Sequence, residues 1–382
     1  MFKNYTITLT TFSPVFIGDG IQISKKDCLY LSNERKVYIM DNMKLFNGIR
    51  KAGLLKQYEN FLMDSSQRNF SVFTRNNSIP LNDVKKWAAY TLPMNDITDI
   101  NNSRKNGGGS DNILSFIKDK FGCPYIPGSS LKGALRTVIQ NAVCIEGNKD
   151  SMAGIRKNIE TEVFEKRPKY LLSTEKKLSE NLFHTLNRKE EKKSDMLNDA
   201  FAGFRVSDSL PLDVSSLILC QKIDRHPDGR DISLPIKREC IKPGTKIEFQ
   251  LEIDTDMMDI SADEIIRYVQ VVFDEYEETF LDEFNDDNIV YCDCNAPIVI
   301  GGGTGYVSKT SVYSLYKEKS DAVKTVQKIM IDTTSTKKQR DPHKHYEDTK
   351  IHRISPHIRK LTRYDGILYD MGICNIEIKA VK

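Results

Sequence analysis

The stretch IVIGGGTGYVSKT, residues 298–310, carries residue types that bind phosphate groups. Glycine has no Cβ, so a glycine-rich turn can bring backbone N–H groups close to an anion. A lysine at the end of the stretch would add positive charge. The residues concerned are Gly301, Gly302, Gly303, Gly305 and Lys309. The loop could hold a nucleoside triphosphate or phosphates of another kind, and a plain turn between strands is the alternative.

The nucleotide interpretation can be tested against the P-loop motif, G-x-x-x-x-G-K-[ST], which connects a strand to a helix. Gly303 matches the first glycine of the motif, but Ser308 stands where the second is required. The following residues SVYSLY, 311–316, alternate polar and apolar types and predict a strand. A P-loop needs the N-terminus of a helix at this place. We therefore expect no hydrolysis of a nucleoside triphosphate.

A second phosphate candidate is YIPGSSLKGALRTVIQNAV, residues 125–143. Its apolar residues recur at the spacing of a helix with one buried face. They are Leu131, Ala134, Leu135, Val138, Ile139, Ala142 and Val143. Gly128 allows a tight turn before the helix, and Ser129 or Ser130 is expected to supply the N-cap. The pattern predicts a helix that begins near Leu131.

Two cations follow the expected helix start. Lys132 and Arg136 are four residues apart, so they should lie on one exposed side of the first turns. Gly133 between them would let another backbone approach closely. The helix dipole, unpaired N–H groups, serine hydroxyls and these charges would together form an anion site. An ordinary capped helix of the core is the alternative.

Positive charge is concentrated in the segment 337–363. The chain has 56 Lys and Arg against 53 Asp and Glu, a net charge of +3. The segment alone has nine basic and three acidic residues, so it carries +6 and the remainder −3. Such asymmetry predicts a surface that faces a polyanion, although a solvated loop would look the same. The candidates for phosphate contact are Lys337, Lys338, Arg340, Arg353 and Arg359.

Histidines gather in the same segment, in HKHYEDTKIHRISPH. With the neighbouring acids they could bind a metal or act as acid and base in RNA cleavage. The four are His343, His345, His352 and His357, and Cys292 and Cys294 add two possible thiolates. However, the chain has no Cys-x2-Cys pair or His-x3-His pair, and His343 and His345 would point to opposite faces of a strand. We therefore expect no metal, and hydrogen bonds from histidine to phosphate are the preferred interpretation.

The elements that must position these motifs alternate between strands and single helices. The expected strands include residues 5–9, a hairpin around 33–35, and several segments between 201 and 254. Helical patterns cover 42–64, 81–91 and much of 149–200, and residues 98–112 read as a flexible polar loop. This order predicts an α+β fold with two lobes, 1–148 and 201–382, separated by a charged helical insertion at 149–200.

A strong helix is predicted to begin after Ser261, which forms a capping-box pattern with Glu264. Its apolar face comprises Ile265, Val269, Val272, Phe273, Tyr276, Phe280 and Phe284. The opposite face is rich in Asp and Glu between residues 274 and 282. Because these charges would repel phosphate, this face should meet water rather than nucleic acid.

Composition supports an ordinary globular protein of the cytoplasm. The chain has 382 residues, of which 39% are apolar and 29% charged, enough for two domains with cores. We see no signal peptide and no apolar run of the roughly 18 residues that a membrane helix needs. Eight cysteines in a chain of this length suit a reducing compartment rather than a disulfide framework.

Four motifs carry a resemblance to a known family. PGSSLKGALR resembles the signature of the RAMP superfamily of CRISPR-Cas proteins, and IGGGTGYVSKT is similar to the glycine-rich loop of such proteins. FSPVFIGDG at 12–20 and SPHIRKLTRYDGILYDMGICNIEI at 355–378 complete an order that resembles one subunit of type III-A (Csm) effector complexes, at the 3′ end of the crRNA. The resemblance spans the chain, although 42–91 and 149–200 contribute little to it.

The resemblance implies two ferredoxin-like (RRM-type) lobes and a non-catalytic subunit without a cofactor. Such a subunit would bind crRNA near its 3′ end and support crRNA maturation and complex assembly in antiviral defence. Its partners would be crRNA, neighbouring RAMP subunits and, in maturation, host ribonucleases, with no membrane involved. A RAMP-fold ribonuclease that trims guide RNA is the alternative, and Asp19 is the position that suggests it.

The resemblance also implies that the RNA contacts lie in the motifs above, because such proteins hold RNA by its backbone and shape. Tyr306 is the main candidate for stacking on a base. The expected RNA-binding residues are Gly128, Ser129, Ser130, Lys132, Gly133, Arg136, Gly301, Gly302, Gly303, Gly305, Tyr306, Lys309, Lys337, Lys338, Arg340, Arg353 and Arg359.

Overall fold

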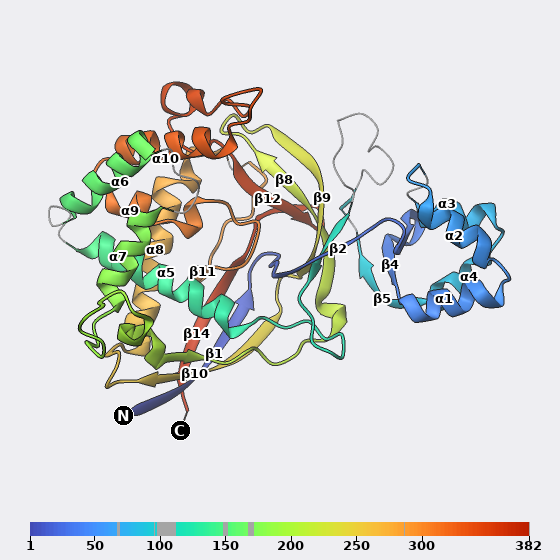
Figure 1. Ribbon diagram of the computed structural model, residues 1–382, viewed down its shortest axis with the longest axis horizontal. Coiled ribbons are helices and arrows are strands. Elements are labelled where there is room, and N and C mark those ends of the chain that lie inside the picture. The colour runs from blue at the N-terminus through green and yellow to red at the C-terminus, as the bar shows by residue number, and fades with distance from the viewer. Residues whose placement is uncertain are drawn as a thin grey trace.

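The computed structural model of the chain describes residues 1–66, 69–94, 96–97, 112–147, 152–166, 172–285 and 287–381. Helices and strands are mixed throughout, which confirms the α+β expectation in its general form (Figure 1). The predicted loop at 98–112 lies outside the described residues, except for Asn112. Among the described residues, no helix is long and apolar enough to cross a membrane.

The first sheet is antiparallel and has five strands. Their order is β11 (Pro297–Val299), β14 (Ile373–Ala380), β1 (Phe2–Thr11), β10 (Lys246–Asp254) and β7 (Phe204–Val206). In the central strand β1 the residues Tyr5, Ile7 and Leu9 are buried and alternate with more exposed threonines, as the sequence predicts. The pairing of β1 with β14 brings the two chain ends side by side (Figure 1).

The second sheet has six strands. Their order is β13 (Ile367–Asp370), β12 (Arg359–Tyr364), β8 (Leu217–Arg225), β9 (Asp231–Ile241), β6 (Ile113–Phe116) and β2 (Gly18–Ile23), and only the pair of β6 with β9 is parallel. Segments 1–148 and 201–382 each contribute strands to both sheets. They are therefore interleaved, and their division into two ferredoxin-like lobes stays a prediction.

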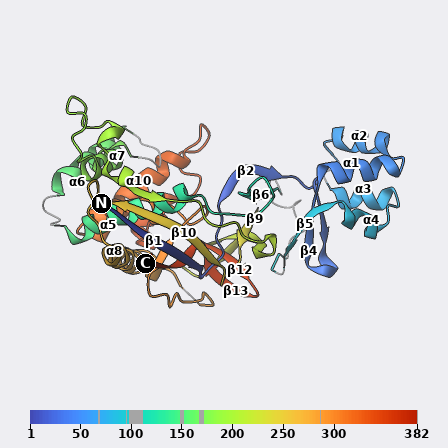
Figure 2. The ribbon, with the colours of Figure 1, turned by 90° about the horizontal axis from the view of Figure 1, so that it is seen from below.

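A small lobe projects from the body (Figure 2). It combines the sheet β3 (Cys28–Leu31), β4 (Lys36–Met40) and β5 (Ala88–Pro93) with α1 (Asn42–Lys51), α2 (Leu55–Met63), α3 (Phe70–Asn76) and α4 (Leu81–Lys86). The predicted hairpin is confirmed as β3 and β4. The helix predicted over 81–91 is wrong beyond Lys86, because Ala88 already pairs with β4. A core of its own, built around Ile49, Phe61 and Phe70, holds the lobe together.

Two long helices pack on the first sheet. They are α5 (Gly128–Glu146) and α8 (Ala262–Thr279), which contact each other and bury Leu131, Leu135, Ile265 and Val269 in the main core. The capping box of α8 is confirmed, since the Ser261 hydroxyl accepts from the Glu264 N–H at 3.1 Å. The apolar spacing of both helices explains their position, because each has one face that must leave water.

Further helices cover the body beyond α5 and α8. They are α6 (Ala153–Lys166), α7 (Ser173–Phe183), α9 (Val312–Leu315) and α10 (Lys319–Thr334). The helical content predicted for 149–200 is confirmed by α6 and α7, which pack against each other. The strand predicted for residues 311–316 is wrong. All six residues are buried, and four of them form the short helix α9. The alternation of polar and apolar residues therefore did not mark a strand with one exposed face.

Candidate nucleic-acid interface

The start of α5 differs from the expected anion site. The helix begins at Gly128, with Pro127 at the N-cap position, so neither Ser129 nor Ser130 caps it. A Cβ on Gly128 would lie 2.3 Å from the carbonyl oxygen of Ser207, which explains the glycine. The Gly128 N–H donates to the Asp208 carboxylate at 2.8 Å. This carboxylate supplies the negative charge that a helix N-terminus favours, so RNA phosphate is not needed there.

Arg136 makes structural contacts instead of pointing into water. One guanidinium nitrogen lies 2.7 Å from the carboxylate of Asp199, whose side chain is only 5% exposed. The guanidinium carbon lies 4.3 Å from the ring centre of Phe183 and 5.2 Å from that of Phe201. An arginine between two rings with a buried carboxylate partner holds the helix to its surroundings. The expectation that Arg136 is exposed is therefore wrong.

Lys132 extends over the same aromatic side chain. Its ammonium lies 5.4 Å from the centre of the Phe201 ring. Burial lowers the pKa of Lys132, and the nearby charges of Arg136 and Arg205 act in the same direction, opposed by Asp199. Lys132 and Arg136 thus share one side of α5, as predicted, but this side is only partly open to solvent.

The glycine-rich loop has the backbone that its composition predicts. Gly301, Gly303 and Gly305 have φ values of 82°, 85° and 92°, a region that residues with a Cβ seldom adopt. The Gly302 N–H donates to the carbonyl oxygen of Phe16 at 2.7 Å, and a Cβ on Gly301 would lie 2.3 Å from the same oxygen. The loop is therefore fixed against the segment that enters β2.

Cations lie in and beside this loop, and we call them the basic cluster: Arg238, Lys309 and Lys360. Arg238 lies beside Gly303, and Lys360 beside Gly305. Partial burial lowers the pKa of Lys309, as does the nearby charge of Arg238. Burial lowers the pKa of Lys360 to about 8, although Asp224, 3.0 Å from its ammonium, opposes the shift. The cluster therefore carries more positive than negative charge and would be stabilised by an anion.

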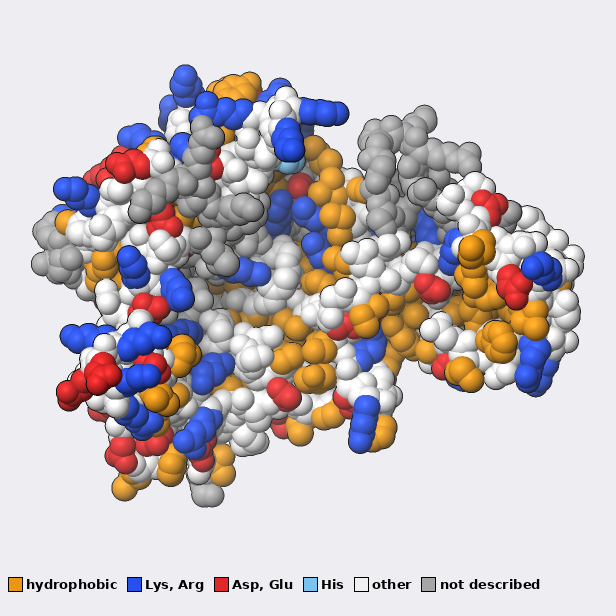
Figure 3. Space-filling model, viewed as in Figure 1, with side chains coloured by type: hydrophobic (Ala, Val, Ile, Leu, Met, Phe, Trp, Pro, Cys, Tyr) orange, Lys and Arg blue, Asp and Glu red, His pale blue; other side chains and the backbone are white. Residues whose placement is uncertain are grey.

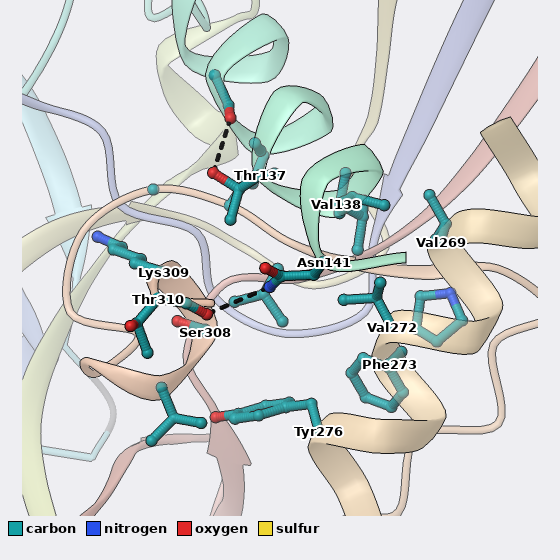
Figure 4. Close-up of a pocket in the computed structure, with 18 of the residues that line it drawn as sticks. Thr137, Val138, Asn141, Val269, Val272, Phe273, Tyr276, Ser308, Lys309 and Thr310 are labelled. Carbon is teal, nitrogen blue, oxygen red and sulfur yellow. Dashed lines mark hydrogen bonds between the residues drawn. The ribbon is translucent and has the colours of Figure 1, made fainter. Parts of the chain in front are cut away.

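The two predicted motifs meet in one cavity of about 430 Å³ (Figure 4). One wall is the face of α5 that carries Ser130, Gly133, Thr137 and Asn141. The glycine-rich loop supplies Gly301, Gly302, Ser308 and Lys309, and α8 supplies Val269, Val272, Phe273 and Tyr276. Figure 3 shows Lys and Arg side chains inside the hollow of this face of the molecule. Residues as far apart in the chain as Asn141 and Thr310, separated by 169 positions, thus form one concave, partly basic site.

Sequence reasoning missed several residues of this site. Arg238 lies in β9, Lys360 in β12 and Asn141 in α5. The local sequence patterns of these elements mark the three residues only as ordinary surface or core positions. Tyr306 is half-buried, and its hydroxyl lies 3.4 Å from that of Thr310. Its predicted stacking on a base is not tested.

The basic segment divides into two groups. Lys337, Lys338, Arg340 and Arg353 are exposed, as a contact with a polyanion requires. Arg359 is buried, and its guanidinium makes a bidentate pair with Asp370 at 2.8 and 2.7 Å. A third bond joins Arg359 to the Leu281 carbonyl oxygen at 3.1 Å. The expectation that Arg359 meets RNA is wrong because its charge is already neutralised inside the protein.

Histidines do gather in space, around a buried carboxylate. Asp348 lies 3.1 Å from His345 Nδ1, 2.5 Å from His357 Nδ1 and 2.5 Å from the Ser355 hydroxyl. Burial acts to raise the pKa of Asp348, but these three partners outweigh it and the pKa is lowered. The hydrogen bonds account for the cluster without an ion. His343 and His345 do not lie in a strand, since the intervening Lys344 has a φ of 59°.

The same three residues, His345, Asp348 and His357, are the one group in the described part of the chain that could supply three metal ligands. Cys292 and Cys294 belong to no such group there. Asp19 is exposed, and its carboxylate accepts from the Ile21 N–H at 2.8 Å. It adjoins Gly18, which lines the cavity.

Comparison with known proteins shows the family of the chain. The RAMP superfamily matches residues 8–296. The "CRISPR system Cms protein Csm5" of Streptococcus thermophilus is 29% identical over 392 residues, covering 100% of this chain and 98% of that protein. Its namesake from Mycobacterium tuberculosis (strain CDC 1551 / Oshkosh) is 30% identical over 401 residues, covering 99% and 98%.

Solved structures show a similar fold. A chain in the cryo-EM structure of a Csm-crRNA-target RNA ternary complex of a type III-A CRISPR-Cas system matches with a TM-score of 0.60 and 18% identity, over 99% of this chain and 100% of that one. The crystal structure of T. onnurineus Csm5 matches with a TM-score of 0.62 and 17% identity, over 96% and 99%. The chain therefore belongs to the RAMP superfamily and, within it, to the Csm5 proteins of type III-A CRISPR systems.

Proposed function

We propose that this type III-A effector subunit is a non-catalytic crRNA-binding protein that holds the guide RNA backbone near its 3′ end. It would thereby support crRNA maturation and assembly of the complex in antiviral defence. The observation that carries the proposal is the shared cavity: Gly133 of α5 and Gly301 of the glycine-rich loop line it together, beside Lys309. The similarity to a chain from a complex named for its crRNA supports the same ligand.

The physical argument rests on close approach and charge. Glycines at the cavity edge let a ribose–phosphate chain come within hydrogen-bond distance of the protein backbone. Arg238 and Lys309 add charge without a fixed acceptor pattern, so they attract any phosphate and carry no base information. Such a site suits a guide whose own bases must remain available for pairing.

The partners follow from this role. Neighbouring RAMP subunits would contact the chain along the RNA, and separate host ribonucleases would trim the exposed 3′ end. The alternative is a ribonuclease of the same fold, favoured by one observation: Asp19 is exposed beside Gly18 at the cavity. Its carboxylate could take a proton from an attacking hydroxyl if RNA lay there.

Binding of a labelled single-stranded guide 3′ end to the purified chain tests the proposal. Lys309→Ala should weaken the affinity by about tenfold, as expected for loss of one charge-assisted contact. Lys56→Ala is the matched control, because Lys56 is an exposed lysine whose side chain is 79% accessible in the projecting lobe. It should leave the affinity unchanged. Equal loss in both variants would show that binding is not located at the loop.

Cleavage separates the two candidate functions. The RNA should stay intact when it is incubated with the protein, with or without Mg²⁺. Cleavage by the native chain that disappears in Asp19→Asn would establish the ribonuclease instead. Asp213→Asn is a suitable control, since Asp213 is another exposed carboxylate and accepts from the Ser215 N–H at 2.8 Å, as Asp19 does from Ile21.

A further inference from the structure

The cavity between α5 and α8 has features that backbone binding does not use. Its volume of about 430 Å³ falls within the range of sites that enclose small organic groups. Its inner walls are Val138 of α5 and Val272, Phe273 and Tyr276 of α8 (Figure 4). A phosphate would gain nothing from such apolar surfaces, whereas a flat ring would bury both of its faces.

One polar group in this wall has no partner. Asn141 is only 5% exposed, and its Nδ2 donates to the carbonyl oxygen of Thr310 at 3.2 Å. Because a carbonyl oxygen can only accept, this bond fixes the orientation of the amide. Asn141 Oδ1 is buried and makes no hydrogen bond. Buried acceptors are nearly always satisfied in folded proteins, so this oxygen indicates a missing donor.

We infer that this cavity receives one unpaired nucleobase of the bound RNA, with an N–H group of the base donating to Asn141 Oδ1. The inference rests on the proposed function and deepens it. The ribose and phosphate would remain at the polar edge, beside Ser130, Gly133 and Lys309. Unstacked bases in protein pockets are the usual way in which single-stranded RNA is recognised, and every base has both a flat face and a donor.

Charge favours a base over the side chain of a protein partner. Lys309 stands in the cavity wall, and the charge of Arg238 is close enough to lower the pKa of Lys309. A base arrives with its phosphates attached, so these cations would be compensated. An apolar side chain of a protein would leave them unpaired. The mixed lining, basic at the edge and apolar inside, therefore fits a nucleotide.

Gly133 permits a clean test. A Cβ at Gly133 would have no protein atom within 4 Å, yet this residue lines the cavity. Gly133→Leu should therefore fill the entrance without disturbing the fold, and leucine favours a helix more than glycine does. Gly154→Leu is the matched control, because Gly154 lies in helix α6 with equally open surroundings.

The experiment scans a guide 3′-end RNA with a single abasic nucleotide at each position in turn. For the native full-length chain, one abasic position should weaken binding by about tenfold, the effect of losing one stacked base. This sensitivity should disappear in Gly133→Leu and in Asn141→Leu. It should persist in Gly154→Leu, because Gly154 lies outside the cavity.

The outcomes are distinct. If the native chain binds RNA and no abasic position weakens the binding, the base pocket is wrong and the proposed function stands. The same holds if an abasic position weakens binding equally in the native chain and in both cavity variants. Failure of the native chain to bind RNA would overturn both. If Gly133→Leu binds every RNA normally but loses a neighbouring protein subunit on co-purification, the cavity holds a protein side chain and the inference is wrong.

Discussion

Asn141 of α5 donates its side-chain amide to the carbonyl oxygen of Thr310, 3.2 Å away, at the end of the glycine-rich loop. The preceding residue of the helix makes a second connection, because Gln140 donates to the Ser311 hydroxyl. These two bonds hold the helix and the loop at a fixed separation, on either side of the cavity (Figure 4). The site is therefore formed before any ligand arrives, which reduces the entropy lost on binding.

Lys132 and Arg136 should respond differently to replacement by alanine. Arg136→Ala leaves the buried carboxylate of Asp199 without its cation, so we expect a loss of up to about 3 kcal/mol in the free energy of unfolding. Lys132→Ala should change stability little and weaken RNA binding if phosphate passes over the first turns of α5. Thermal unfolding and RNA affinity, measured on both variants, check this. Equal melting of the two variants would show that the Asp199 pair contributes nothing.

The exposed basic segment should determine how RNA affinity depends on salt. Replacing Lys337, Lys338 and Arg340 with alanine should flatten the plot of log affinity against log salt by about 2 units, if each meets one phosphate of a single strand. Affinity measured at several salt concentrations gives this slope. Alanine at Arg188, Lys192 and Lys193, three exposed cations in another segment, is the control and should keep the native slope. An unchanged slope in the first variant would mean that the segment does not meet RNA.

His226, whose ring centre lies 5.6 Å from that of His357 in the histidine cluster around Asp348, should make stability depend on pH. Burial lowers the pKa of His226, and the adjacent His357, Arg230 and His352 add to the effect while Asp228 opposes it. A histidine whose folded pKa lies below the ordinary 6.5 or so binds its proton more readily when unfolded. The contribution of neutral His226 to the free energy of unfolding is therefore fully present above about pH 6.5, and it is lost as the pH falls below that value.

His226→Asn should flatten this dependence between pH 7.5 and pH 5.5, measured by thermal unfolding. His184→Asn is the control, since His184 contacts the Lys193 carbonyl oxygen far along the chain from the cluster and should leave the slope unchanged. A native protein that melts at the same temperature across this range would contradict the assignment.

Nucleoside triphosphates should not bind. The structure removes one of the two sequence arguments, because a helical turn, α9, follows the loop where a strand was predicted. The other remains: Ser308 replaces the second glycine of the motif, and its hydroxyl donates to the Thr304 carbonyl oxygen at 3.2 Å. Calorimetry with ATP and GTP should give no heat of binding. Micromolar affinity that is lost in Lys309→Ala would falsify this expectation.

Much of the framework could be predicted from sequence because its signals are local. The apolar spacing from Leu131 to Val143 defines α5, the Ser261 capping box fixes the start of α8, and three glycines with positive φ explain the loop. In each case the residues that determine the structure lie within a few positions of one another. The wrong predictions concern features that depend on the packing of distant segments. A pattern over six residues, 311–316, could not reveal that all six are buried.

The partners of charged residues could not be predicted, because strand pairing and tertiary packing bring them together. Asp199 is 63 residues from Arg136, and Asp370 is 11 residues from Arg359 across a hairpin. Counting cations along a segment cannot distinguish a buried ion pair from a free charge. The cavity itself depends on the packing of α5 against α8, so no single stretch of sequence indicates Asn141.

Photo-crosslinking most directly tests the claim that both motifs line one RNA site. Guide 3′-end RNA with 4-thiouridine placed along its length would be irradiated with the full chain, and the crosslinked peptides identified by mass spectrometry. We expect crosslinks from one short stretch of RNA to both residues 128–141 and residues 301–309, because these line the same cavity. Crosslinks confined to the projecting lobe, residues 28–93, or to the acidic face of α8 would contradict the account.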